Sequence, residues 1–76
     1  MLPYGYSVKN YPAMRGLPQW AADRKIGNRL DNVGWYHTEA EANAACRAHC
    51  AAELRRLAST AHWSIAQEYA DLAANL

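Results

Sequence analysis

The sequence has no phenylalanine and only two isoleucines and two valines, although 51% of its 76 residues are hydrophobic. Its apolar residues are therefore mainly Ala, Leu, Tyr and Trp, and a core built from them is small. A chain of this length supports one hydrophobic core. We expect a single domain over residues 1–76, with a β-rich part at 1–37 and a helical part at 38–76.

Long apolar runs, a strong charge excess and a cysteine framework are also missing. No window approaches eighteen consecutive apolar residues, and the first residues lack the basic segment and apolar run of a signal peptide, so we expect a cytoplasmic protein. Eight basic residues stand against seven acidic ones, which is unlike a chain that acts by charge alone. Cys46 and Cys50 lie four residues apart in an Ala-rich stretch, and we expect them to be reduced thiols.

All three prolines and all four glycines lie in the first 34 residues, together with five basic and two acidic residues. Tyr4, Tyr6 and Val8 alternate with small or polar residues, which predicts a strand over 4–9. Residues 19–23 and 29–36 flank the turn-forming pair Gly27-Asn28, which predicts a β-hairpin. The alternative is a helix over 18–32, but a glycine and an asparagine in its middle would cost about 1–2 kcal/mol.

The second half has neither proline nor glycine, and its acidic residues outnumber its basic ones by five to three. Thr38 and Glu41 form a capping-box pattern, so a helix is predicted to begin at residue 39. Apolar residues then recur every three or four positions as far as residue 61, and again from Ile65 to Leu76. Ser59-Thr60 marks a break, and typical helix lengths favour two helices over one. The predicted fold is α+β: a small antiparallel sheet, made of a strand and a β-hairpin, packed against one or two C-terminal helices.

Cys46, His49 and Cys50 are the only cluster with the character of metal ligands, because positions i, i+3 and i+4 share a helix face. The paired C-x-x-C motifs of structural zinc sites are missing, and buried cysteine commonly packs as a small hydrophobe. We therefore predict neither a metal nor another cofactor. The histidines and carboxylates form no pattern of nucleophile, base and oxyanion donors, so we also predict no catalytic residues and no enzymatic activity.

Three tryptophans and five tyrosines are too many for so small a core to bury completely. Aromatic residues and arginine are enriched in binding hot spots. We therefore predict a non-catalytic module that binds a protein partner, with homodimerisation as another outcome. The candidate contact residues are Trp20, Arg24, Lys25, Arg29, Trp35, Tyr36 and Tyr11.

The alternative function is nucleic-acid binding through a basic β-hairpin. Arg24, Lys25 and Arg29 cluster near the predicted turn, with Lys9 and Arg15 earlier in the chain. Together with nearby aromatic side chains they could follow phosphates and stack on bases. The sequence pI of about 7.8 is lower than in typical nucleic-acid-binding domains, so the protein partner is the first expectation.

The segments Trp20-Ala21-Ala22-Asp23-Arg24 and Val33 to Ala45 resemble parts of small phage and prophage proteins. In these proteins a hairpin leads through a T-E-A-E-A cap into an Ala-rich helix, and the resemblance covers residues 19–50. In size and style the chain is similar to phage anti-CRISPR proteins. That resemblance implies an inhibitor that sterically blocks a bacterial nuclease or CRISPR effector complex in the host cytoplasm, and it implies no particular site residue.

Overall fold

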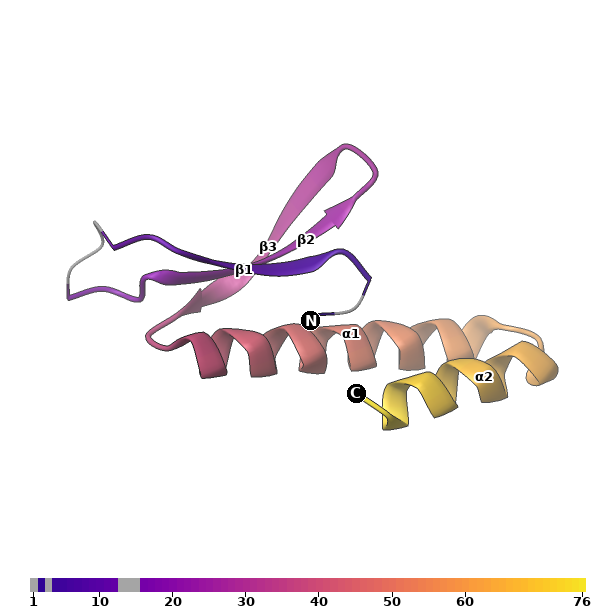
Figure 1. Ribbon diagram of the computed structural model, residues 1–76. Helices are drawn as coiled ribbons and strands as arrows, with labels where there is room; N and C mark the ends of the chain where they lie inside the picture. Colours follow the sequence, from indigo (N-terminus) through magenta and orange to yellow (C-terminus); the bar gives the residue numbers. More distant parts are fainter. Residues whose placement is uncertain (1, 3, 13–15) are drawn as a thin grey trace.

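The computed structural model describes residues 2, 4–12 and 16–76 (Figure 1). Three antiparallel strands form one sheet in the order β1-β2-β3, and two helices follow them. The element bounds are β1 (Tyr6–Asn10), β2 (Trp20–Ile26), β3 (Arg29–Tyr36), α1 (Glu39–Thr60) and α2 (Trp63–Ala74). The predicted α+β fold and the β-hairpin are confirmed, and the alternative helix over 18–32 is wrong.

The hairpin between β2 and β3 is closed by a two-residue turn at Gly27-Asn28, because Ile26 pairs with Arg29. Gly27 has φ +60°, the left-handed conformation that such turns need and that glycine adopts without steric cost. Figure 1 shows this end of the hairpin projecting away from the helices. The side chains at the turn are consequently exposed.

A β-bulge lies part-way along the hairpin. The register shifts between Ala22 and Asp23, so that Ala22 pairs with Gly34 while Asp23 pairs with Asn32. Val33 is the additional residue on β3. Beyond a bulge, the side chains of the bulged strand point to the opposite side of the sheet from the side that unbroken alternation would give. This bulge therefore determines where the aromatic side chains of β3 point.

Helix α1 packs across one face of the sheet (Figure 1). Thr38 caps its first turn, because the Thr38 hydroxyl accepts a hydrogen bond from the Glu41 amide at 3.1 Å. The sheet-facing side chains of the helix include Ala42, Cys46 and Cys50, all buried. These residues are small, which lets the helix approach closely, and the two thiols are free core residues as expected.

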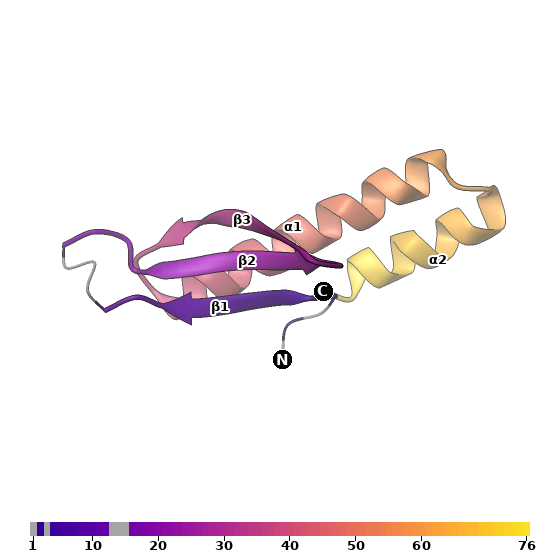
Figure 2. The same cartoon turned by 90° about the horizontal axis from the view of Figure 1, so that it is seen from above.

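Helix α2 folds back along α1 as an antiparallel partner (Figure 2). The predicted break is confirmed: α1 ends at Thr60, and the His62 side chain caps α2 by accepting from the Ser64 amide. Among the residues of α2, Ala73 is the buried one. The predicted stripe on α2 is therefore only partly covered, and Leu72 remains 43% exposed.

Candidate binding face

The sheet face opposite α1 is covered by neither helix in the described part of the chain (Figures 1 and 2). The pairing of β2 with both neighbours shows which residues share this side of the pleat. We call this side the outer face. Its described residues on the strands and directly after β1 are Ser7, Lys9, Tyr11, Ala21, Asp23, Lys25, Leu30, Asn32 and Trp35.

The middle of the outer face is a shallow strip bordered by long side chains. Ala21 of the central strand pairs with Lys9 on one side and with Trp35 on the other. Ala21 is only 2% exposed although no helix covers it, because the side chains beside it are much longer than its methyl group. The floor of the strip is therefore formed by the small side chain of Ala21, and its edges by the Lys9 ammonium group and the Trp35 indole.

Tyr11 and Trp35 form an exposed aromatic pair on this face. Their ring centroids lie 5.3 Å apart, and the ring planes are tilted by 53°. Tyr11 is held beside β2 because its amide donates to the Gln19 carbonyl at 2.8 Å. The two side chains are 42% and 43% exposed, so a broad aromatic surface is open to a partner.

The accessible charge on the outer face is positive. Lys9 and Lys25 are both exposed, whereas the face's described acidic side chain, Asp23, is only 7% exposed. Asp23 accepts a hydrogen bond from the Asn32 side-chain amide at 3.1 Å, which the bulge brings opposite it. An approaching partner therefore meets two ammonium groups and an aromatic pair rather than a carboxylate.

The structure divides the predicted contact residues into separate groups. Tyr11, Lys25 and Trp35 share the outer face, where Tyr11 lies beside Trp35 and Lys25 lies nearer the hairpin turn. Trp20 and Tyr36 are half-buried and pack on the core beneath the sheet. Sequence reasoning did not single out Ser7 and Asn32, which belong to the outer face; strand alternation from Lys9 indicates Ser7, but the bulge that places Asn32 has no clear signal in the sequence.

The predicted basic cluster at the hairpin is also divided. Arg24 lies on the helix side of the sheet, with its guanidinium over the Tyr6 ring at 5.2 Å and 3.9 Å from the Glu53 carboxylate. Arg29 forms an exposed ion pair with Asp31 at 2.9 Å, and this hydrogen-bonded pair raises the pKa of Arg29 and lowers the pKa of Asp31. Arg15, also named in the basic set, lies outside the described residues.

The helix side of the sheet holds the chain's most chemically reactive groups in unreactive form. Burial raises the pKa of both Cys46 and Cys50, which keeps them protonated and poor nucleophiles. His49 points toward the sheet and is hydrogen-bonded through Nδ1 to the Tyr6 hydroxyl, whose pKa burial also raises. Within the described residues, no three His, Cys, Asp or Glu side chains converge to hold a metal ion.

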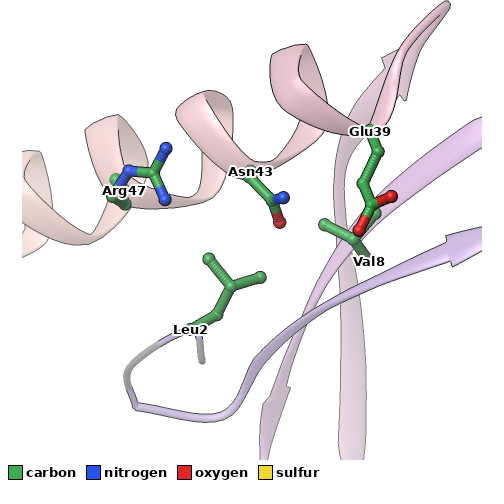
Figure 3. A pocket seen from close by; sticks show the side chains of 5 residues that line it. All are labelled: Leu2, Val8, Glu39, Asn43 and Arg47. Atoms are coloured by element: carbon green, nitrogen blue, oxygen red, sulfur yellow. The ribbon is translucent and has the colours of Figure 1, made fainter.

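Two hollows lie on the helix side. One, of about 290 Å³, lies between β1 and the start of α1 (Figure 3). Its wall from α1 is formed by Glu39, Asn43 and Arg47, which face Leu2 and Val8 across the hollow. The other, of about 200 Å³, lies where α1 and α2 meet the ends of the strands.

Comparison with known proteins finds no matching family model, no matching curated protein and no matching solved structure. Among the described residues, neither helix combines the length and the apolar character needed to cross a membrane.

Proposed function

We propose that the protein is a non-catalytic cytoplasmic binding module whose outer face binds nucleic acid. The observation that carries this proposal is the sign of the accessible charge: Lys9 and Lys25 are exposed, while Asp23 is buried and hydrogen-bonded. Nucleic acid binds such a face favourably because each lysine that pairs with a phosphate releases a counterion condensed on the nucleic acid. This reverses the order of the two expectations from the sequence, because the pI averages over acidic residues that lie mainly on the helices.

The shape and chemistry of the face support the same partner. Strands enter nucleic-acid grooves in several families of binding proteins, and the major groove is wide enough for a two-stranded ribbon. The hairpin of β2 and β3 projects from the body of the protein (Figure 1), so a duplex can reach it without meeting α1. Tyr11 and Trp35 offer rings on which an unpaired base can stack, while Ser7 and Asn32 add hydrogen-bonding groups.

The proposal predicts a salt dependence of known size. Two phosphate contacts, one for each lysine, correspond to a slope of roughly −1.8 in log K against log salt. Affinity should then weaken about tenfold between 50 and 200 mM salt. Fluorescence anisotropy with labelled duplex DNA, single-stranded DNA and single-stranded RNA measures this slope and identifies the preferred form.

Two variants separate this face from general electrostatic attraction. The double variant K9Q/K25Q should lose most of the affinity and nearly all of the salt dependence. Arg47→Gln/Arg55→Gln is the matched control, because it removes the same charge from exposed positions on α1, away from the outer face. Equal losses in the two double variants, or binding that does not respond to salt, would contradict the proposal.

A protein partner is the second candidate, and exposed apolar side chains at the projecting hairpin favour it. Ile26 and Leu30 are 48% and 63% exposed, and the fully buried core of a protein interface is more apolar than the rest of the surface. The phage-like style of the sequence suggests a bacterial nuclease or CRISPR effector complex, which this surface would block by occupying it. A stoichiometric partner that survives nuclease treatment, and that Leu30→Ser or Trp35→Ala releases, would establish this candidate over the first.

A further inference from the structure

The hollow between the two helices and the strand ends has a mainly apolar wall. Its lining includes Leu54 and Leu57 of α1 and Tyr69 and Leu72 of α2, and its volume is about 200 Å³. Leu57 and Leu72 are 36% and 43% exposed, so the mouth is also apolar. An apolar cavity of about 150 Å³ is large enough for benzene, and this one therefore has room for a ring with a short chain.

Two charged side chains, Arg24 and Glu53, line the same hollow, and the charge of the arginine is not fully compensated. Arg24 is a lining residue, and its Nε is buried without a hydrogen-bond partner. The Glu53 carboxylate lies 3.9 Å from Arg24 but only 2.8 Å from Arg56. Two guanidiniums thus share one carboxylate, and the cluster keeps a net charge of +1.

The rim contains a backbone conformation that ordinary residues avoid. Tyr4 lines the hollow and has φ +52°, in the left-handed region that costs a side-chain-bearing residue energy. The next residue, Gly5, is held to β2 because its carbonyl accepts from the Lys25 amide at 3.1 Å. Strained residues of this kind are concentrated at functional sites, including ligand clamps.

We propose that this hollow is a binding site for a small apolar monocarboxylate, such as an aryl-alkanoate. The carboxylate pairs with the Arg24 guanidinium, and the apolar body packs between Leu57 and Leu72. A neutral ligand of the same shape leaves the arginine uncompensated, whereas a cation is repelled by it. The site lies on the opposite side of β2 from the outer face, so it is a second function, separate from nucleic-acid binding.

The test uses 3-phenylpropionate as the probe and 3-phenylpropanol as its neutral counterpart. Titration of the full chain, followed by ¹H–¹⁵N NMR spectra, should show saturable shifts for the acid at Arg24, Cys50, Leu57 and Leu72. The alcohol should bind at least about tenfold more weakly, since it cannot form the charge-assisted hydrogen bond. Equal affinities, no saturation, or shifts confined to other parts of the protein would overturn the proposal.

Variants locate the site. Arg24→Gln should abolish the preference for the acid, whereas Arg55→Gln, which removes an exposed charge from the same helix as Glu53, should preserve it. Arg24 also contacts Tyr6, so a second variant tests the site without removing the charge. Leu57→Trp fills the mouth and should prevent both ligands from binding; unchanged binding in that variant would place the ligand elsewhere.

Discussion

A methyl group added at Gly5 should destabilise the protein much more than one added at Gly27. Both glycines have positive φ, +81° and +60°, so an alanine at either position pays about 1–2 kcal/mol for the left-handed conformation. Only at Gly5 is the space also filled: an added Cβ would lie 2.6 Å from the backbone carbonyl oxygen of Lys25. At Gly27 nothing lies within 4 Å.

The clash cannot be relieved by rotating a side chain, because the obstructing atom belongs to the backbone of β2. Overpacking of this kind typically costs about 1–3 kcal/mol, and separation of the strands would also break the hydrogen bond from the Lys25 amide to the Gly5 carbonyl. We therefore expect Gly5→Ala to lose about 1–3 kcal/mol more than Gly27→Ala. In a domain of this size each kcal/mol lowers Tm by roughly 4–8 °C.

Thermal and urea unfolding of the two alanine variants, monitored by circular dichroism, measures the difference directly. Gly27→Ala serves as the control for the backbone conformation, so the gap between the variants reports the close approach of β1 to β2. If the two variants are equally stable, the strands do not approach each other at Gly5 as described. That result would also remove the support that Tyr4 receives at the rim of the second hollow.

Three further predictions concern the helices and the core. Thr38→Ala should lower the free energy of unfolding by about 1 kcal/mol through loss of the α1 cap, measured by urea unfolding, while Thr60→Ala at the far end of α1 should have a smaller effect. Burial raises the pKa of Tyr6, Cys46 and Cys50, so the folded protein holds these protons more tightly than the unfolded chain. The free energy of unfolding should therefore be unaffected near neutrality and should fall as pH rises above the ordinary thiol pKa of 9.0. Denaturant midpoints that stay constant at alkaline pH would contradict this. Both thiols should react slowly with Ellman's reagent in the native protein and rapidly in denaturant, because they are buried between α1 and the sheet; fast native labelling would show that the sheet does not cover this face of α1.

The local elements were predictable because each has a signal within a few residues. Alternation at Tyr4, Tyr6 and Val8 predicts a strand over 4–9, although β1 begins only at Tyr6. Gly27-Asn28 predicts the hairpin turn. Thr38 predicts the start of the helix to within one residue. These signals depend on backbone geometry and capping, which act over one or two turns of chain, so a single sequence is enough to recognise them.

The faces of the aromatic side chains were not predictable in the same way. Counting back from the turn, where Ile26 pairs with Arg29, places Trp20 opposite Trp35 on one face. The bulge shifts the register by one, so Trp20 pairs with Tyr36 and Trp35 pairs with Ala21. One additional residue on β3 thus sends the two tryptophans to opposite sides of the sheet.

The division of the basic cluster has a partly predictable cause. Arg24 and Lys25 are neighbours on one strand, and neighbours on a strand point to opposite faces. The sequence does not show, however, that Glu53 from α1 lies near Arg24, since that contact depends on where the helix crosses the sheet. Nor does it show that α1 covers the face with Arg24 and leaves the face with Lys25 open, which is the basis of the proposed function.

The central claim, that the outer face binds nucleic acid, is tested most directly by mapping the contact surface. A ¹H–¹⁵N spectrum of the protein with increasing short duplex DNA at low salt should show saturable shifts at Ser7, Lys9, Lys25 and the Trp35 indole, with α2 unchanged. Shifts concentrated on the helices, or no shifts at any concentration of duplex or single strand, would contradict the account.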